Sequence, residues 1–391
     1  MDDFGFVDRL GSNAEKYTLK KKLFGTDDVM PMWVADMDIA TPICVLEAVR
    51  ERLNHPVVGY EIMRDRAYTA QCDWTLRHHD WEIDPRWLSY SPSVVASIGC
   101  AIRAFSEEGD EVIVQSPVYP PFYDMVRKHN RKLVLNPLVR DEGGVYRFDY
   151  DDLKAKITPR TKLLLLCSPH NPVGRVWLRK ELLELGKLCL ENGIVIISDE
   201  VHGDIIFPEN THLPMASLSE TLRDNTVTLM GPGKTFNMAG FSISTVAIAS
   251  PTLRERYRTE LQKVHYAEGA VLSHIAFEAA YAHGDQWHEG LMNHLTVNRE
   301  MIERWCKVHP MIGFTKPQGT YLAWLDCRAL EMGDWELRDF FITQAGLGLS
   351  AGLSFGKEGS GFMRLNFAVT REILAKALDQ LTSALEKNGY G

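Results

Sequence analysis

Three polar runs carry side chains whose types suit chemistry on a carbonyl compound. The runs are Ser168–Gly174 with Asn171, Ser198–His202 with Asp199, and Gly231–Asn237 with Lys234. A lysine desolvated in a crevice can lose its proton and form a Schiff base with a carbonyl. A buried carboxylate can keep a pyridinium nitrogen protonated, and an amide can donate a hydrogen bond to an oxygen on that ring. An acid, an amide and a single lysine in one crevice therefore predict carbonyl–amine chemistry.

Further residues extend this hypothetical site. Tyr119, between Pro117 and Pro121, can stack on a ring face. Ser93, Val94 and Val95 precede an apolar helical stretch and can present backbone N–H groups to a phosphate. Arg364 has apolar neighbours that a strand would bury, and a buried guanidinium needs a counter-ion. A substrate α-carboxylate is one such counter-ion.

Short apolar runs predict the strands that position these residues. They span 111–114, 132–135, 162–167, 194–197, 226–230 and 245–249. The stretch 181–190 has apolar residues at helical spacing and ends at Asn192-Gly193. Strand, helix, strand at this spacing predicts an α/β fold with a mostly parallel central sheet and helices on both faces. Since ligands lie beyond the carboxyl ends of such strands, the three polar runs are expected to converge.

The pattern changes near residue 286. A long helical stretch at 287–308 precedes short strands at 321–325 and 362–367 and helices near 334–344 and 372–387. We expect residues 1–48 to form an N-terminal arm and part of a small domain. Residues 49–285 are expected to form the large cofactor domain, and residues 286–391 a smaller C-terminal α+β domain.

Composition excludes several classes of protein. The 391 residues are 45% hydrophobic with a net charge of −9, and no basic run exceeds Lys20–Lys22, so no nucleic-acid partner is expected. The apolar runs are far shorter than the ~20 residues that span a bilayer. Met1–Phe4 is acidic, unlike a secretory signal. The seven cysteines are odd in number and form no CxxC pair, which favours reduced thiols in a cytoplasmic protein and no zinc site.

Some of these residues also have plainer interpretations. Gly233-Lys234-Thr235 suggests a P-loop, but that motif needs a glycine at position 228, which is Thr228. Taken alone, Asp199 can be a helix N-cap and Tyr119 a packed turn residue.

Three other assignments stay open in the same way. His202 can be a hydrogen-bonded structural histidine. Arg364 can pair with a structural carboxylate such as Asp36 or Asp38. The run at 78–80, His-His-Asp, resembles a metal cluster, but adjacent residues on a helix diverge, so a solvated face is favoured and no metal is expected.

Several motifs, taken in order, resemble those of one enzyme family. Asn171-Pro172-x-Gly174, Ser198-Asp199-Glu200-x-His202 and Gly233-Lys234-Thr235-Phe236-Asn237 resemble the fold-type I pyridoxal phosphate enzymes of the aspartate aminotransferase superfamily. Pro31–Asp38, Gly59-Tyr60, Ser168–Pro172 and Thr320–Asp326 resemble the cystathionine β-lyases of the MalY/PatB type. The likeness covers nearly the whole chain.

The resemblance implies roles for the matched residues. Lys234 would bind pyridoxal 5′-phosphate and shuttle protons, with Asp199 and Tyr119 as further catalytic residues. The cofactor would be held by Lys234, Asp199 at the ring nitrogen, Asn171 and His202 at the ring oxygen, Tyr119 on the ring face, Ser93, Val94 and Val95 at the phosphate, and Tyr60 from a neighbouring subunit. Substrate would meet Arg364, Asn171 and Asp36. A homodimer with shared active sites is therefore expected.

Three departures from the family pattern bear on function. Positions 231 and 233 are both glycine, so a hydroxyl that usually helps to hold the phosphate is missing. Ser242 stands where ordinary aminotransferases have an arginine, which favours a lyase. Glu15-Lys16-Tyr17 stands where this subgroup commonly has Lys-Trp-Asp.

The resemblance implies a carbon–sulfur β-lyase that cleaves cystathionine or S-substituted cysteines to a thiol, pyruvate and ammonia. The main alternative is transamination or another pyridoxal phosphate-dependent deamination. A cofactor-binding protein that has lost its chemistry, and a nucleotide-binding module, are the remaining hypotheses.

Overall fold

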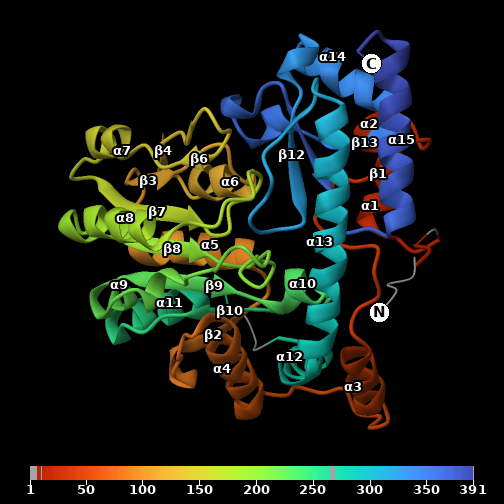
Figure 1. Ribbon diagram of the computed structural model, residues 1–391. Helices are drawn as coiled ribbons and strands as arrows, with labels where there is room; N and C mark the ends of the chain where they lie inside the picture. The colour runs from red at the N-terminus through yellow and green to blue at the C-terminus, as the bar shows by residue number, and fades with distance from the viewer. Residues whose placement is uncertain (1–6, 10, 265–268, 391) are drawn as a thin grey trace.

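The computed structural model describes residues 7–9, 11–264 and 269–390, so residues 1–6 and 10 of the predicted N-terminal arm lie outside it. Its largest element is a seven-stranded sheet in the order β2, β10, β9, β8, β7, β3, β4 (Figure 1). The strands are β2 (Leu88–Ser91), β3 (Glu111–Val114), β4 (Lys132–Leu135), β7 (Thr161–Cys167), β8 (Val195–Asp199), β9 (Thr226–Met230) and β10 (Ser244–Ala247). The strands from β9 to β4 run parallel, which confirms the predicted mostly parallel sheet.

Strand β7 shows why helices cover both faces of this sheet. Successive side chains of a strand point to opposite faces. Leu163 and Leu165 pack into one core with α5 (Val94–Phe105), α6 (Pro121–Lys128) and α11 (Pro251–Gln262). Leu164 and Leu166 pack into the other with α7 (Tyr150–Lys156), α8 (Arg179–Glu191) and α9 (Glu220–Asp224). The continuous apolar run of β7, at 163–167, is therefore buried on both sides.

The direction of the strand after β9 differs from the expectation. The sequence predicts that residues 245–249 continue the parallel series, whereas β10 pairs antiparallel with both β9 and β2. The connection holds only α10 (Pro232–Thr235) and the 3₁₀ turn Ala239–Phe241. It stays at the carboxyl edge of the sheet instead of crossing a face, so β10 starts where β9 ends. This keeps Lys234, on α10, at that edge.

The C-terminal part forms a second unit. Its four-stranded sheet has the order β11 (Gly313–Phe314), β12 (Leu322–Asp326), β15 (Phe362–Asn366), β14 (Ser350–Ala351), and all neighbours pair antiparallel. Helices α13 (Asp285–Val308), α14 (Asp334–Asp339) and α15 (Arg371–Lys387) lie beside it (Figure 1). Near the N-terminus, β1 (Met30–Pro31) pairs parallel with β13 (Leu347–Gly348), and Met32 and Met37 join the core of this unit. The N-terminal segment thus packs with the C-terminal unit.

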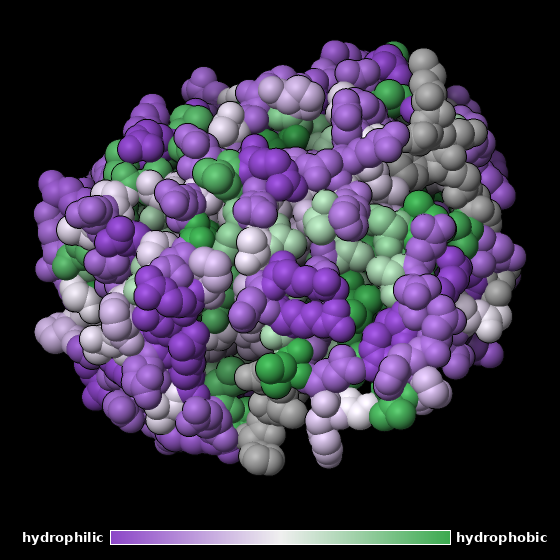
Figure 2. All heavy atoms as spheres, turned by 90° about the horizontal axis from the view of Figure 1, so that it is seen from below, coloured by the Kyte–Doolittle hydropathy of each residue, from purple (hydrophilic) through white to green (hydrophobic). Residues whose placement is uncertain are grey.

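Helices α3 (Ile43–Leu53), α4 (Asp65–His79) and α12 (Val271–His283) form the base of the molecule in Figure 1. The face seen from that side is mainly hydrophilic but is interrupted by apolar patches (Figure 2). The segment between α3 and α4 contributes Val57, Val58 and Ile62, each more than half exposed. Two short helices, α1 (Glu15–Thr18) and α2 (Lys20–Phe24), lie near the N-terminus, and β5 (Val139–Arg140) pairs antiparallel with β6 (Tyr146–Arg147). Within the described ranges, no helix combines the length and the apolar character that a membrane span requires.

Candidate active site

The loops at the carboxyl edge of the large sheet and strand β15 of the small unit meet around a cavity of about 480 Å³. This volume is in the range of small-molecule sites. The sequence-predicted residues that line the cavity are Ser93, Val94, Val95, Tyr119, Asn171, Asp199, His202, Lys234 and Arg364. The expected convergence of the strand ends therefore occurs. Tyr60 and Asp36 do not line this cavity.

Lys234 projects from α10, the single turn that follows β9. Its Nζ donates a hydrogen bond to the carbonyl oxygen of Ala35 at 2.6 Å. Burial, and then the charge of Arg364, lowers the pKa of Lys234 to about 8 against weaker opposition from Asp36, Asp199 and Glu15. An appreciable fraction of the amine is thus unprotonated near neutral pH, as a nucleophile or base requires.

Asp199 ends β8 and is buried. Its Oδ1 accepts a hydrogen bond from the Val201 N–H at 3.1 Å, which caps a turn, since no helix follows. Burial raises the pKa of Asp199 to about 7. No side chain of the described residues makes an ion pair with it. A buried carboxylate in this position is suited to receive a cation from a ligand.

His202 follows in the same loop and is also buried. Its Nδ1 has no hydrogen-bond partner among the described residues. Burial, assisted by the charges of Lys234 and Arg364, lowers the pKa of His202 to about 3, so the ring is neutral. Its ring packs edge-on against Tyr321 with 5.8 Å between centroids. A neutral imidazole with an unused nitrogen can donate to or accept from a ligand atom.

Arg364 on β15 is held by neutral groups. Its Nη1 donates to Asn171 Oδ1 at 2.9 Å, and its Nη2 donates to the Trp33 carbonyl at 2.7 Å and to Ser350 Oγ at 3.3 Å. Its Nε is buried and has no partner among the described residues. Burial lowers the pKa of Arg364 to about 10, so it remains a cation at neutral pH. The guanidinium is positioned without a carboxylate partner in the part of the chain that the structure describes.

The carboxylates considered as partners of Arg364 are used elsewhere. Asp36 pairs with Arg9 at 2.7 Å and with Lys16 at 3.9 Å. Asp38 pairs with Arg9 at 3.0 Å and with the fully buried Lys16 at 2.7 Å. The structural interpretation of Arg364 therefore lacks the carboxylates it needs. Asp36 does not line the cavity, but its negative charge acts on Lys234 and favours the protonated amine.

Tyr119 and Asn171 come from neighbouring loops. The Tyr119 N–H donates to the Asn171 carbonyl at 3.1 Å, and burial raises the pKa of the Tyr119 hydroxyl. Since Arg364 occupies the amide oxygen of Asn171, the amide nitrogen is the atom available to donate toward a ligand. The phenol ring of Tyr119 forms part of the cavity wall.

The opposite end of the cavity begins at α5. Ser93 caps this helix by accepting from the Ala96 N–H at 3.2 Å. The first N–H groups of a helix have no partner within it and favour an anion. A Cβ on Gly231 would lie 3.0 Å from Ser244 Cβ, whereas one on Gly233 would meet only Ala239, at 3.4 Å or more. The close approach of β10 therefore requires a glycine at position 231, whereas position 233 has room for a small side chain.

Sequence reasoning missed several contributors. Ala35 and Trp33 act through main-chain carbonyls, which leave no side-chain signal. Asn366 binds the carbonyls of Val34 and Asp36, at 2.6 Å each. The presence of Asn366 on a buried strand two residues after Arg364 is a signal that could have found it.

The expected solvated face at 78–80 holds for His78 and Asp80, which are exposed, but not for His79. The His78 ring stacks on Trp74 with 3.8 Å between centroids, and His79 Nε2 lies 2.8 Å from Asp204 Oδ1. The His79 ring thus meets another element, whereas the His78 ring packs on a residue of its own helix and stays exposed. No group of metal-ligating side chains is present in the described part of the chain.

Comparison with known proteins places these features in context. Residues 27–381 match the family described as aminotransferase class I and II. The chain is 38% identical to cystathionine beta-lyase PatB of Bacillus subtilis over 97% of its own length and 98% of the relative's. The crystal structure of cystalysin from Treponema denticola, which contains pyridoxal 5′-phosphate, has a TM-score of 0.95 at 32% identity, covering 99% of both chains. A PLP-bound C–S lyase from Staphylococcus hominis has a TM-score of 0.90 at 31% identity, with 99% and 100% covered.

Proposed function

The chain belongs to the aminotransferase class I and II family and is a pyridoxal 5′-phosphate-dependent carbon–sulfur lyase, and on that premise we propose that it acts on cystathionine or S-substituted cysteines through the cavity residues described above. Its substrate is a small amino acid. The products are a thiol, pyruvate and ammonia, formed by α,β-elimination and the uptake of one water molecule.

The residues present fit this cofactor. Asp199 is a buried carboxylate that makes no ion pair with a described residue, and it suits a protonated ring nitrogen. His202 Nδ1 and the Asn171 amide are polar atoms that can meet the ring oxygen. The N-terminus of α5 suits a phosphate. Lys234, with its pKa lowered to about 8, suits the aldehyde.

One observation carries the choice of reaction. Lys234 and Arg364 are the only cationic side chains among the described residues that line the cavity. Arg364 accounts for one carboxylate, and no other arginine among the described lining residues is available for a second one. Trp33, Val34 and Phe355 give the remaining wall an apolar character that suits a thioether. The site therefore favours a thioether side chain over a short acidic side chain such as that of aspartate.

The chain's own residues divide the work. Arg364 binds the substrate α-carboxylate and so orients the Cα–H bond toward Lys234. The Lys234 amine takes the Cα proton, and its ammonium can return a proton to the leaving sulfur. Asp199 keeps the ring nitrogen protonated. When bound, the cofactor supplies a sink for the electron pair left at Cα.

We also propose a homodimer in which Tyr60 reaches the partner's cofactor phosphate. Tyr60 is fully exposed, and Val57, Val58 and Ile62 around it are more than half exposed. An exposed apolar segment of this kind marks an interaction surface. Among the described residues that line the cavity, the phosphate end has no cationic side chain other than Lys234 nearby, so a donor from a second copy would complete it.

Two further assignments belong to the same proposal. Residues 49–285 form the large cofactor domain, and residues 1–48 together with 286–391 form the small one; the separate sheets and the pairing of β1 with β13 support this division. A cytoplasmic location is supported by the seven cysteines, all of which are free thiols.

The test is an assay of purified holoprotein with cystathionine and a panel of S-alkyl cysteines. We expect equal amounts of thiol and pyruvate, and no pyruvate release by K234A that retains the wild-type circular dichroism spectrum. Amino-group transfer to a keto acid without thiol release would instead establish transamination.

A further inference from the structure

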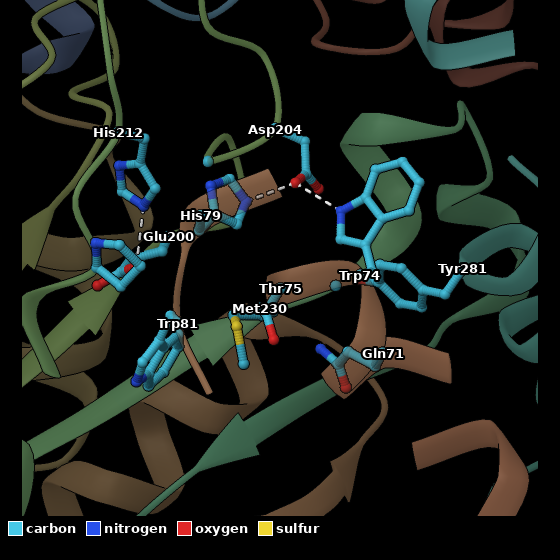
Figure 3. A pocket seen from close by; sticks show the side chains of 13 residues that line it. Gln71, Trp74, Thr75, His79, Trp81, Glu200, Asp204, His212, Met230 and Tyr281 are labelled. Atoms are coloured by element: carbon cyan, nitrogen blue, oxygen red, sulfur yellow. Dashed lines mark hydrogen bonds and ion pairs between the residues drawn. The ribbon is translucent and has the colours of Figure 1, made fainter. Parts of the chain in front are cut away.

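A second hydrogen-bonded cluster lies behind the cavity and is centred on Asp204, two residues after His202. Its Oδ1 lies 2.8 Å from Trp74 Nε1 and 2.8 Å from His79 Nε2. Its Oδ2 accepts a hydrogen bond from Thr235 Oγ1 at 2.6 Å. In Figure 3 the Asp204 carboxylate lies between the His79 and Trp74 rings, both of which belong to α4. Both carboxylate oxygens are thus occupied.

The cluster is screened from solvent. The Asp204 side chain is 12% exposed and the His79 side chain 10%. Burial alone would raise the pKa of Asp204, but the hydrogen bond and charge of His79, the charge of His288 and the Thr235 hydroxyl together hold it well below its usual range. Asp204 is therefore an anion at every pH at which the enzyme would work.

Thr235 is the residue next to Lys234 on the same helix. That helix, α10, has only four residues, and its N-cap Gly231 has no side chain to cap it. A single turn makes too few internal hydrogen bonds to fix its own orientation. Two side-chain anchors hold this region: Thr235, which is fully buried and bound to Asp204, and Asn237, whose Nδ2 donates to the carbonyls of Met37 and Ile39.

We propose that Asp204 and Thr235 are positioning residues for Lys234, and that their hydrogen bond sets the orientation of α10 from which the lysine amine enters the cavity. This inference rests on the role proposed for Lys234. The largest charge effects on Lys234 come from Arg364, Asp36, Asp199 and Glu15. The contact that links Asp204 to the lysine helix is its hydrogen bond from Thr235, the neighbour of Lys234.

The same cluster ties α10 to other parts of the molecule. His288 Nε2, on α13, lies 2.7 Å from the Asp204 carbonyl oxygen. Trp74 and His79 connect it to α4, which begins directly after the exposed segment that carries Tyr60. Asp204 thus joins the lysine helix, the loop of Asp199 and His202, and two long helices at one point.

The test uses variants that change single hydroxyl groups. T235V removes the donor and keeps the shape, and T235S restores the donor. T226V is the matched control, because Thr226 is equally buried on β9 and donates to the Leu222 carbonyl at 2.7 Å, away from α10. D204N removes the charge at the other end of the bond.

The first readout needs neither cofactor nor substrate. In the cofactor-free protein, acetylation of Lys234 is followed by mass spectrometry over a pH series. We expect a midpoint near the pKa of about 8 in the wild type and T226V, and a higher midpoint, toward the ordinary 10.5, in T235V and D204N, where Lys234 is less firmly held in its buried position. T235S should restore the wild-type midpoint, and the double variant T235V/D204N should shift no further than either single variant.

The second readout is turnover. In the holoenzyme, T235V should lower kcat for pyruvate release about tenfold or more with little change in KM, as expected when a catalytic group is slightly displaced. An unchanged midpoint in T235V, or an equal shift in T226V, would overturn the inference even if the lyase is fully active. Loss of the proposed lyase function itself would appear instead as a wild type without turnover, whatever the labelling shows.

Discussion

Asp199, the last residue of β8, and Asp204, in the loop that follows, lie five residues apart, yet their environments differ completely. Asp199 faces the cavity, accepts one backbone hydrogen bond, and burial raises its pKa to about 7. Asp204 faces the opposite side, is bound by Trp74, His79 and Thr235, and its pKa is held below the usual range. The protein thus supplies side-chain partners for the Asp204 carboxylate, whereas the Asp199 carboxylate is left to be paired by a ligand.

Two buried arginines show the same contrast. Arg175 is bound to Glu181 at 2.5 Å and to the Tyr146 carbonyl. Arg364 meets only neutral groups among the described residues. A buried charge without a counter-charge lowers stability, and it is retained where a bound molecule will supply the counter-charge. A buried charged side chain that has no counter-charge among the described residues is therefore a candidate for ligand binding.

The largest expected effect is the loss of activity on replacing Asp199, the carboxylate left for a ligand. D199N should lower kcat/KM for thiol release about 10²- to 10⁴-fold, because the ring nitrogen loses the group that keeps it protonated. The melting temperature of the cofactor-free protein should not fall, since a costly buried charge is removed. A large loss of stability with near-normal turnover would reverse the assignment.

The arginine pair gives the next effect. R364Q should raise KM about 10- to 100-fold with little change in the stability of the cofactor-free protein, because the lost contact is to the substrate carboxylate. R175Q should instead cost about 3 to 5 kcal/mol in unfolding free energy, because Glu181 in the interior loses its close ionic partner and keeps only Arg147, at 3.9 Å. Denaturant titration and steady-state kinetics on both variants separate the two roles. The comparison fails if the two arginines behave alike.

The two aspartates should also impose opposite pH dependences on stability. The folded-state pKa of Asp199 lies above its ordinary 3.8, so its burial lowers stability progressively as pH rises from about 4 to about 7. The folded-state pKa of Asp204 lies below 3.8, so its contribution is present above that pH and is lost as pH falls further.

Melting curves of the cofactor-free wild type measured against D199N and D204N over pH 3 to 8 would show these trends. The melting temperature of the wild type should fall relative to that of D199N as pH rises, and should be higher than that of D204N at neutral pH. Parallel curves for all three proteins would contradict the assignment of both environments.

The smallest effect concerns the two glycines of the lysine loop. G233S should tighten pyridoxal phosphate binding a few-fold, about the contribution of one hydrogen bond, because the site has room for a hydroxyl near the phosphate. G231A should instead lower stability by about 1 to 3 kcal/mol, because its Cβ would press on Ser244. Cofactor titration and thermal melts distinguish these outcomes, and tighter binding by G231A would oppose them.

The sequence could predict features that depend on local patterns. Continuous apolar runs such as 162–167 predicted buried parallel strands, and the polar residues at their ends converge as expected. The direction of β10 was not predictable, because it depends on how residues 231–243 turn at the sheet edge rather than on their apolar pattern.

Other features of the site arise only from the tertiary structure. The Ala35 carbonyl that meets Lys234 lies 199 positions away in the chain and has no side-chain signal. His79 appeared exposed by its helical position, but Asp204, from a distant loop, covers it. Contacts of this kind are set by packing between elements and leave little trace in local composition.

The central claim is that Lys234 binds the cofactor and drives the reaction. It is tested most directly by treating the holoprotein with borohydride, digesting it and identifying the peptide that carries the reduced cofactor. We expect one modified lysine, Lys234, together with loss of pyruvate release in the treated protein. Modification at another lysine, or a fully active protein after reduction at Lys234, would contradict it.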